Sequence, residues 1–134
     1  SRMDIKPFSH RMHIGAPGTG RLSPGVSSFD VFAAAFPAGT LSGAPKPRAV
    51  DIIDELVPSD RGIYGGTVGY FDFSGNLDMA IAIRTAFLRD HEASVQAGAG
   101  IVLDSVPGNE WQETRNKAEA SVEAVQIAAR LRNL

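Results

Sequence analysis

Two carboxylates and one ammonium group recur along a single predicted helical face near the end of the sequence. Within GNEWQETRNKAEASVEA (108–124), Glu110, Glu113 and Lys117 are spaced by three and four residues, which places them on one stripe of a helix. Two carboxylates at this spacing can share a hard cation such as Mg²⁺, which takes oxygen ligands and keeps several waters. The alternative is an exposed Glu–Lys pair on a solvated helix, and the segment taken alone favours it.

A single charged side chain lies among small ones in MAIAIRTAF (79–87). In a strand, Arg84 shares one face with Ala80, Ala82 and Ala86. Burying an unpaired guanidinium is costly, so Arg84 needs an anion, and its planar fork matches a carboxylate. The alternatives are an ion pair with an acid of the protein, or an edge-strand arginine that reaches water. The residues do not separate these possibilities.

Two glycines alternate with alanines in QAGAG (96–100). Glycine weakens a strand and often marks the close approach of a ligand to the backbone. The N–H groups of Gly98 and Gly100 could therefore bind an anion. A tight packing site or a bulge is the alternative, and it is the better explanation for a lone pair of glycines.

Two further segments carry weaker signals. The loop FPAGTLSGAPK (36–46) leads into a helix, and such loops hold phosphates or carboxylates but also simply cap helices. A lone histidine such as His13 in RMHIGAPG is more often a surface or hydrogen-bonded core residue than an acid or base.

The elements that must position these residues can be read from periodicity and from turn residues. We predict helices at about 28–36, 45–57 and 108–132, and strands at 65–73, 77–88 and 93–103 with turns at 74–76 and 89–92. The strands are expected to form an antiparallel meander, and the fold class is α+β, of the α/β sandwich type. It has mainly antiparallel strands, packed helices and a long C-terminal helix. The expected core stripe of that last helix contains Trp111, Ala118, Val122, Val125 and Ala129.

The composition excludes several classes of protein. The chain has 134 residues, of which 43% are hydrophobic and 21% charged, as in one globular domain with a modest core. Its net charge is −2 without a dense lysine or arginine run, which argues against a nucleic-acid partner. It has no cysteine, no apolar run near the ~18 residues of a membrane span and no signal-peptide core. We expect a cytoplasmic protein with no membrane partner.

Three long segments together resemble one enzyme family. FPAGTLSGAPKPRAVDIIDEL, RGIYGGTVGYFDFSGNLDMAIAIRT and QAGAGIVLDSVPGNEWQETRNKA resemble the C-terminal part of the chorismate-utilising enzymes, and within that family the large subunit of anthranilate synthase. The resemblance covers nearly the whole chain. It implies an α+β fold that is part of the larger chorismate-binding fold.

The resemblance implies an enzyme that acts on chorismate, a small dianion, with Mg²⁺ as its cofactor. An anthranilate synthase adds ammonia to the ring, removes the hydroxyl group and eliminates pyruvate, which gives anthranilate for tryptophan biosynthesis. A glutamine amidotransferase subunit supplies the ammonia. By this resemblance Glu110 and Glu113 hold Mg²⁺, which holds the ring carboxylate, and Lys117 sits beside that carboxylate.

The remaining roles concern the two carboxylates of the substrate. By the same resemblance, Arg84 and Tyr64 bind the carboxylate of the enolpyruvyl arm, with help from the N–H groups of Gly98 and Gly100. Thr40 is a catalytic-site residue that contacts the region of the ring carboxylate.

The resemblance makes His13 a general acid–base near the leaving hydroxyl. The sequence after it departs from the family, because IGAPGTG (14–20) stands where a strand is usual. Proline cannot donate to a strand ladder, so we expect Gly15, Ala16 and Pro17 to disturb that strand.

Family members are several hundred residues long, so residues 1–134 are expected to be the C-terminal part of a chorismate-binding catalytic domain. The absent upstream part carries another acidic metal ligand, and the isolated chain is therefore expected to show little or no turnover. The alternatives are aminodeoxychorismate synthase or an isochorismate or salicylate synthase. A further one is a non-catalytic truncated paralogue that binds a partner subunit or forms a homo-oligomer.

Overall fold

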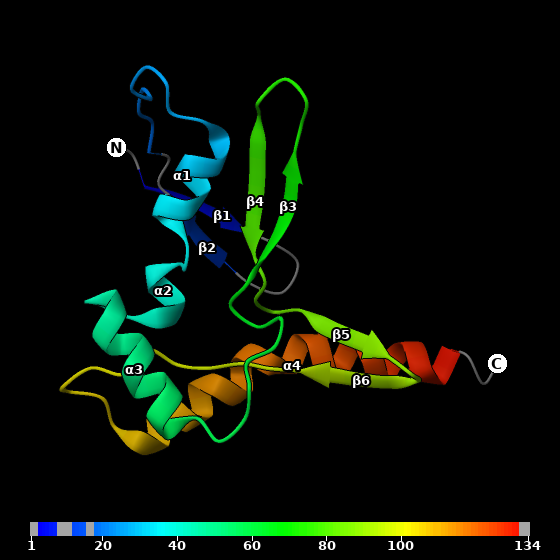
Figure 1. The fold of residues 1–134 in the computed structure, drawn as a ribbon. Coiled ribbons are helices and arrows are strands. Elements are labelled where there is room, and N and C mark those ends of the chain that lie inside the picture. Colours follow the sequence, from blue (N-terminus) through cyan, green and yellow to red (C-terminus); the bar gives the residue numbers. More distant parts are fainter. Residues whose placement is uncertain (1–2, 8–11, 16–17, 132–134) are drawn as a thin grey trace.

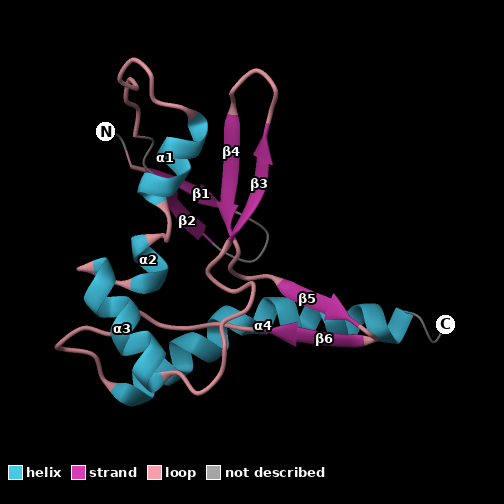
Figure 2. Cartoon of the chain, viewed as in Figure 1, coloured by secondary structure: helices cyan, strands magenta, loops and turns pink. Residues whose placement is uncertain are grey.

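Helices and short antiparallel strands make up the chain, and the α+β fold class is confirmed (Figures 1 and 2). The computed structural model describes residues 3–7, 12–15 and 18–131. The elements in chain order are β1 (Asp4–Pro7), β2 (Met12–Gly15), α1 (Ser28–Ala35), α2 (Gly39–Ser42), α3 (Lys46–Leu56), β3 (Thr67–Phe71), β4 (Leu77–Ile81), β5 (Ala86–Arg89), β6 (Glu92–Val95) and α4 (Pro107–Leu131).

The strands form three separate antiparallel pairs, β1–β2, β3–β4 and β5–β6, instead of the expected meander. The predicted strand 77–88 is interrupted between Ile81 and Ala86, where Arg84 has a φ of 51°. Because this left-handed conformation cannot continue a strand, β4 ends before it and β5 starts after it. The third predicted strand ends at Val95, since the small residues that follow have little to pack on a pleated surface.

Residues 12–15 do form a strand, and Gly15 pairs with Asp4 across the β1–β2 ladder. The expectation that the residues after His13 disturb this strand is therefore wrong for Gly15. Glycine only weakens a ladder, whereas proline removes a donor from it. Ala16 and Pro17 lie outside the described residues.

Local capping fixes α1 and the β3–β4 turn. The N-cap Ser27 and Asp30 form a reciprocal capping box, in which the Ser27 N–H donates to the Asp30 carboxylate at 2.8 Å. At the β3–β4 tip, the Asp72 carboxylate accepts from the Asn76 side chain at 2.7 Å and from the N–H groups of Ser74 and Asn76 at 2.8 Å. These hydrogen bonds hold the pKa of both carboxyl groups below the ordinary 3.8.

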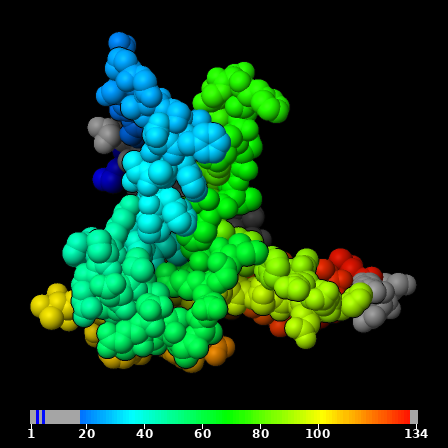
Figure 3. Space-filling view, in the orientation of Figure 1, coloured from blue at the N-terminus to red at the C-terminus, as the bar shows by residue number. Residues whose placement is uncertain are grey.

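The described part of the chain has little enclosed core. Among its hydrophobic residues only Ala82 is buried, at 4% exposure. In one arm of the structure, α1 lies beside the β3–β4 hairpin (Figures 1 and 3). The Phe29 and Phe71 rings stack between these elements, with their centroids 4.2 Å apart. In the other arm, α4 lies along the β5–β6 hairpin.

The face of α4 that the rest of the chain covers overlaps the predicted apolar stripe only at Ala118 and Val125. Trp111 is 60% and Val122 39% exposed, and Ala129 is exposed as well, so the core prediction is wrong for these three residues. The half-buried helix residues are Glu110, Thr114, Lys117, Ala118, Ser121 and Val125. Apolar periodicity indicates which face favours burial, but the neighbours present decide which face is covered. Here those neighbours lie over the stripe that carries Glu110 and Lys117.

No helix within the described ranges combines the length and the apolar character that crossing a membrane requires.

The capping box predicts a pH dependence of stability. Because the folded pKa of Asp30 lies below 3.8, its contribution is fully present above that pH and is lost as the pH falls through the folded value. Asp30→Asn should therefore reduce the difference between the melting temperatures at pH 7 and pH 3. Asp51→Asn, in the middle of α3, is the matched control. An unchanged difference in Asp30→Asn would contradict the assignment.

The β5–β6 turn predicts a stabilising substitution. Asp90 and His91 both have positive φ, 49° and 66°, in a two-residue turn of the type that favours glycine. His91→Gly should relieve left-handed strain and raise the free energy of unfolding by up to about 1 kcal/mol. Urea unfolding measures the change. Glu92→Gly, one residue later in β6, should lower stability instead, and equal effects of the two variants would refute the argument.

Candidate functional site

Five separate segments of the chain line a cavity of about 390 Å³, a volume within the usual range for small-molecule sites. The segments are α2, the turn before β3, the break between β4 and β5, the stretch after β6, and α4. Six of the predicted site residues lie in its walls: Thr40, Tyr64, Arg84, Gly98, Gly100 and Lys117.

A pair of backbone hydrogen bonds holds two of these segments together. The Gly65 N–H donates to the Ala82 carbonyl and the Ala82 N–H donates to the Gly66 carbonyl, both at 2.9 Å. Gly65 has a φ of 79°, which a larger residue would adopt only with strain. Tyr64 precedes this junction and Arg84 follows it, so the junction sets the position of both side chains.

Tyr64 packs against the QAGAG segment. A methyl group on Gly98 would lie 3.1 Å from the Tyr64 hydroxyl, whereas one on Gly100 would meet nothing within 4 Å. For Gly98 the tight-packing alternative therefore fits the geometry. Gly100 has open space beside it in the same cavity wall.

Arg84 is not on a strand face as predicted. It is exposed, lies at the break between β4 and β5, and reaches the cavity wall from a left-handed backbone conformation. Backbone strain of this kind at a non-glycine residue persists only where the surroundings enforce it, and it clusters at functional sites.

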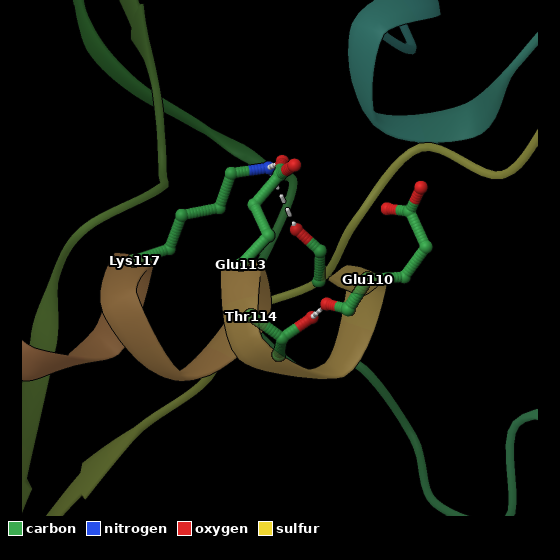
Figure 4. Close-up of polar contacts among 5 residues, drawn as sticks. Glu110, Glu113, Thr114 and Lys117 are labelled. Carbon is green, nitrogen blue, oxygen red and sulfur yellow. Dashed lines mark hydrogen bonds and ion pairs between the residues drawn. The ribbon is translucent and has the colours of Figure 1, made fainter. Parts of the chain in front are cut away.

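Lys117 joins α4 to the QAGAG segment. Its ammonium group donates to the Gly98 carbonyl at 3.2 Å and pairs with the Glu113 carboxylate at 2.5 Å (Figure 4). The Lys117 side chain is 32% exposed and that of Glu113 is 53% exposed. The expected Glu–Lys pair is thus present, and it forms at the edge of the cavity and not on a fully solvated face.

Glu110 and Glu113 project from the same side of α4, and the Glu110 carboxylate stands apart from the Glu113–Lys117 pair (Figure 4). The described residues contain no group of three or more His, Cys, Asp or Glu side chains that could hold a metal. Mg²⁺ is commonly bound through one or two carboxylates, waters and substrate oxygens, and Glu110 and Glu113 supply two carboxylates. The donor chemistry of this pair therefore fits the cofactor that the sequence suggested.

The structure describes the whole of Thr40 but only the backbone of His13. Thr40 is exposed on the four-residue helix α2, at the cavity. The His13 backbone pairs with Lys6 in the β1–β2 ladder, and its side chain lies outside the described part of the structure. Its role remains a prediction.

The sequence analysis missed Arg61, which lines the cavity and donates to the Leu41 carbonyl at 2.8 Å. The sequence did contain a signal for this residue. In RGIYGG, Arg61 stands three residues before Tyr64, a spacing at which one turn brings the two side chains close together.

The chain is similar to known proteins of one family. The family model of chorismate binding enzymes matches residues 1–123. Anthranilate synthase component 1 of Arthrobacter globiformis is 58% identical over 132 residues, which are 98% of this chain and 25% of that protein. The Aquifex aeolicus protein of the same name is 59% identical over 126 residues, 94% of this chain and 26% of its own length.

A solved structure is similar as well. Anthranilate synthase component I from Streptococcus pneumoniae TIGR4 matches with a TM-score of 0.77 and 49% identity, over 87% of this chain and 27% of that one. The chain thus spans about a quarter of the length of these relatives. The resemblance predicted from the sequence is confirmed, and the chain belongs to the family of chorismate binding enzymes.

Proposed function

We propose that this chain is part of the large subunit of an anthranilate synthase, which converts chorismate and ammonia to anthranilate and pyruvate in tryptophan biosynthesis. The observation that carries the proposal is the cavity in which Arg84, Tyr64 and Lys117 meet beside a helix face bearing two carboxylates. A dianionic substrate needs cationic and N–H donors for both of its carboxylates.

One end of the cavity takes the enolpyruvyl carboxylate. Arg84 supplies a planar pair of donors, the Tyr64 hydroxyl supplies a third, and the N–H groups of Gly98 and Gly100 complete the set. The Tyr64–Gly98 contact keeps these donors close together, so that the arm is oriented before its elimination as pyruvate.

The other end takes the ring. Glu110 and Glu113 would hold Mg²⁺, and the ion pair with Lys117 keeps the Glu113 carboxylate at the cavity edge. When bound, Mg²⁺ supplies Lewis-acid stabilisation of charge on the ring carboxylate. Thr40 contacts the same carboxylate region, and His13 delivers a proton to the departing hydroxyl, which leaves as water.

Ammonia for the reaction comes from a glutamine amidotransferase subunit, as the family resemblance suggests. Because the proposed reaction consumes ammonia itself, an ammonium salt can take the place of that subunit in an assay. The direct test is therefore anthranilate fluorescence from the natural gene product containing this chain, with chorismate, MgCl₂ and an ammonium salt. The mass of the product separates anthranilate from an aminated chorismate that retains the enolpyruvyl arm, and such a product would overturn the proposal.

Neutralising either helix carboxylate should weaken the binding of Mg²⁺. Glu110→Gln and Glu113→Gln should each lower kcat/KM at least about 10- to 100-fold, and should raise the Mg²⁺ concentration for half-maximal rate. Glu119→Gln, on the exposed opposite face of the same helix, is the matched control. The metal assignment fails if all three variants share one Mg²⁺ titration curve.

A methyl group at Gly98 should disturb Tyr64 specifically. Gly98→Ala places a carbon 3.1 Å from the Tyr64 hydroxyl, so the ring must shift and the KM for chorismate should rise about tenfold. Gly108→Ala, which meets nothing within 4 Å, is the control. Gly98→Ala in a Tyr64→Phe background should cost less than in the wild type, and equal costs would contradict a role through that hydroxyl.

A further inference from the structure

Arg61 makes two interactions at once, with two segments that line the cavity. Its side chain donates from Nη1 to the Leu41 carbonyl at 2.8 Å, and its guanidinium carbon lies 5.7 Å from the centre of the Tyr64 ring. Arg61 is half-buried and lies in the wall between the site cavity and a second one of about 280 Å³. Arg61 therefore lies in the cavity wall next to the two segments that carry Thr40 and Tyr64.

The first support is α2. A helix of four residues is too short to be stable alone, and its last carbonyls lack partners within the helix. Arg61 supplies a charged donor to one of these carbonyls, that of Leu41. The Leu41 side chain also packs over Gly65, where its Cδ1 lies 3.6 Å from the position of a Cβ. The location of Thr40, the neighbour of Leu41 on α2, thus depends on this turn.

The second support is Tyr64. Its N–H donates to the Arg61 carbonyl at 2.9 Å, so the two residues form one tight turn. The guanidinium covers the ring on one side, and Gly98 approaches the hydroxyl at the far end. A cation over the ring and a close backbone contact at the hydroxyl together restrict rotation of the side chain.

We propose that Arg61 is a positioning residue that holds Thr40 and Tyr64 in register with each other across the cavity. The identity of the substrate in this inference rests on the proposed function. An arginine suits the task because its planar group donates to a carbonyl along its edge and stacks on a ring with its face, whereas a lysine offers a point charge. Its contacts are with other residues of the wall, so Arg61 acts through them.

The test compares Arg61→Met and Arg61→Lys with Arg89→Met in the natural gene product that contains this chain. Arg89 is the matched control, because its side chain is 76% exposed and its ion pair is with the adjacent Asp90. Steady-state kinetics with chorismate measure KM and kcat separately. Hydrogen exchange without substrate measures protection of the amides in 38–43 and 61–66.

Arg61→Met should raise the KM for chorismate about tenfold, as expected for loss of a charged hydrogen bond, with a smaller change in kcat. Protection in both segments should fall. Arg61→Lys should restore protection in 38–43 more than in 61–66, because lysine can still donate to Leu41 but stacks poorly. In a Tyr64→Phe background, Arg61→Met should raise KM less than it does alone.

Equal exchange and equal KM in Arg61→Met and Arg89→Met would overturn the inference, as would a KM effect that is fully additive with Tyr64→Phe. The exchange experiment separates this inference from the proposed function. If protection falls as expected but the wild-type protein forms no anthranilate, then the positioning role stands and the assignment of the substrate fails.

Discussion

The two backbone hydrogen bonds between Gly65–Gly66 and Ala82 are the constraint on which the site depends. They join the turn before β3 to the end of β4, around the buried Ala82. Tyr64 precedes this junction in the chain and Arg84 follows it, and both residues line the cavity. These hydrogen bonds fix the backbone of both segments, so they set the points from which the Tyr64 and Arg84 side chains extend.

The sequence predicted the three longer helices well, because capping residues and prolines mark the ends of α1 and α3. The four-residue helix α2 lies in the segment 36–46 that was predicted to be a loop. Ser27 with Asp30 begins α1, and the prolines near α3 lie close to its two ends. The strands were predicted less well. A left-handed residue at Arg84 divides what alternation alone indicates to be one strand, and no side-chain pattern reports the backbone angle of an arginine.

Residues predicted for the site lie together where charge and spacing coincide, as Glu113 and Lys117 do. Arg61 was missed because its contacts are with Leu41 and Tyr64, a carbonyl and a ring that carry no complementary charge in the sequence. The apolar stripe of α4 predicted the covered face of the helix only in part, for a different reason. Its periodicity describes the preference of the helix, while the half-buried Glu110 and Lys117 face the neighbours that this part of the chain provides.

The spacing of the contacts across the cavity has a consequence for how the chain folds. Arg61 and Leu41 are 20 residues apart, and Lys117 and Gly98 are 19 residues apart. Each contact closes a loop of about the same length, and the entropy cost of closing a loop grows only slowly with that length. The two contacts therefore carry nearly equal closure costs, and sequence separations as short as these favour rapid folding.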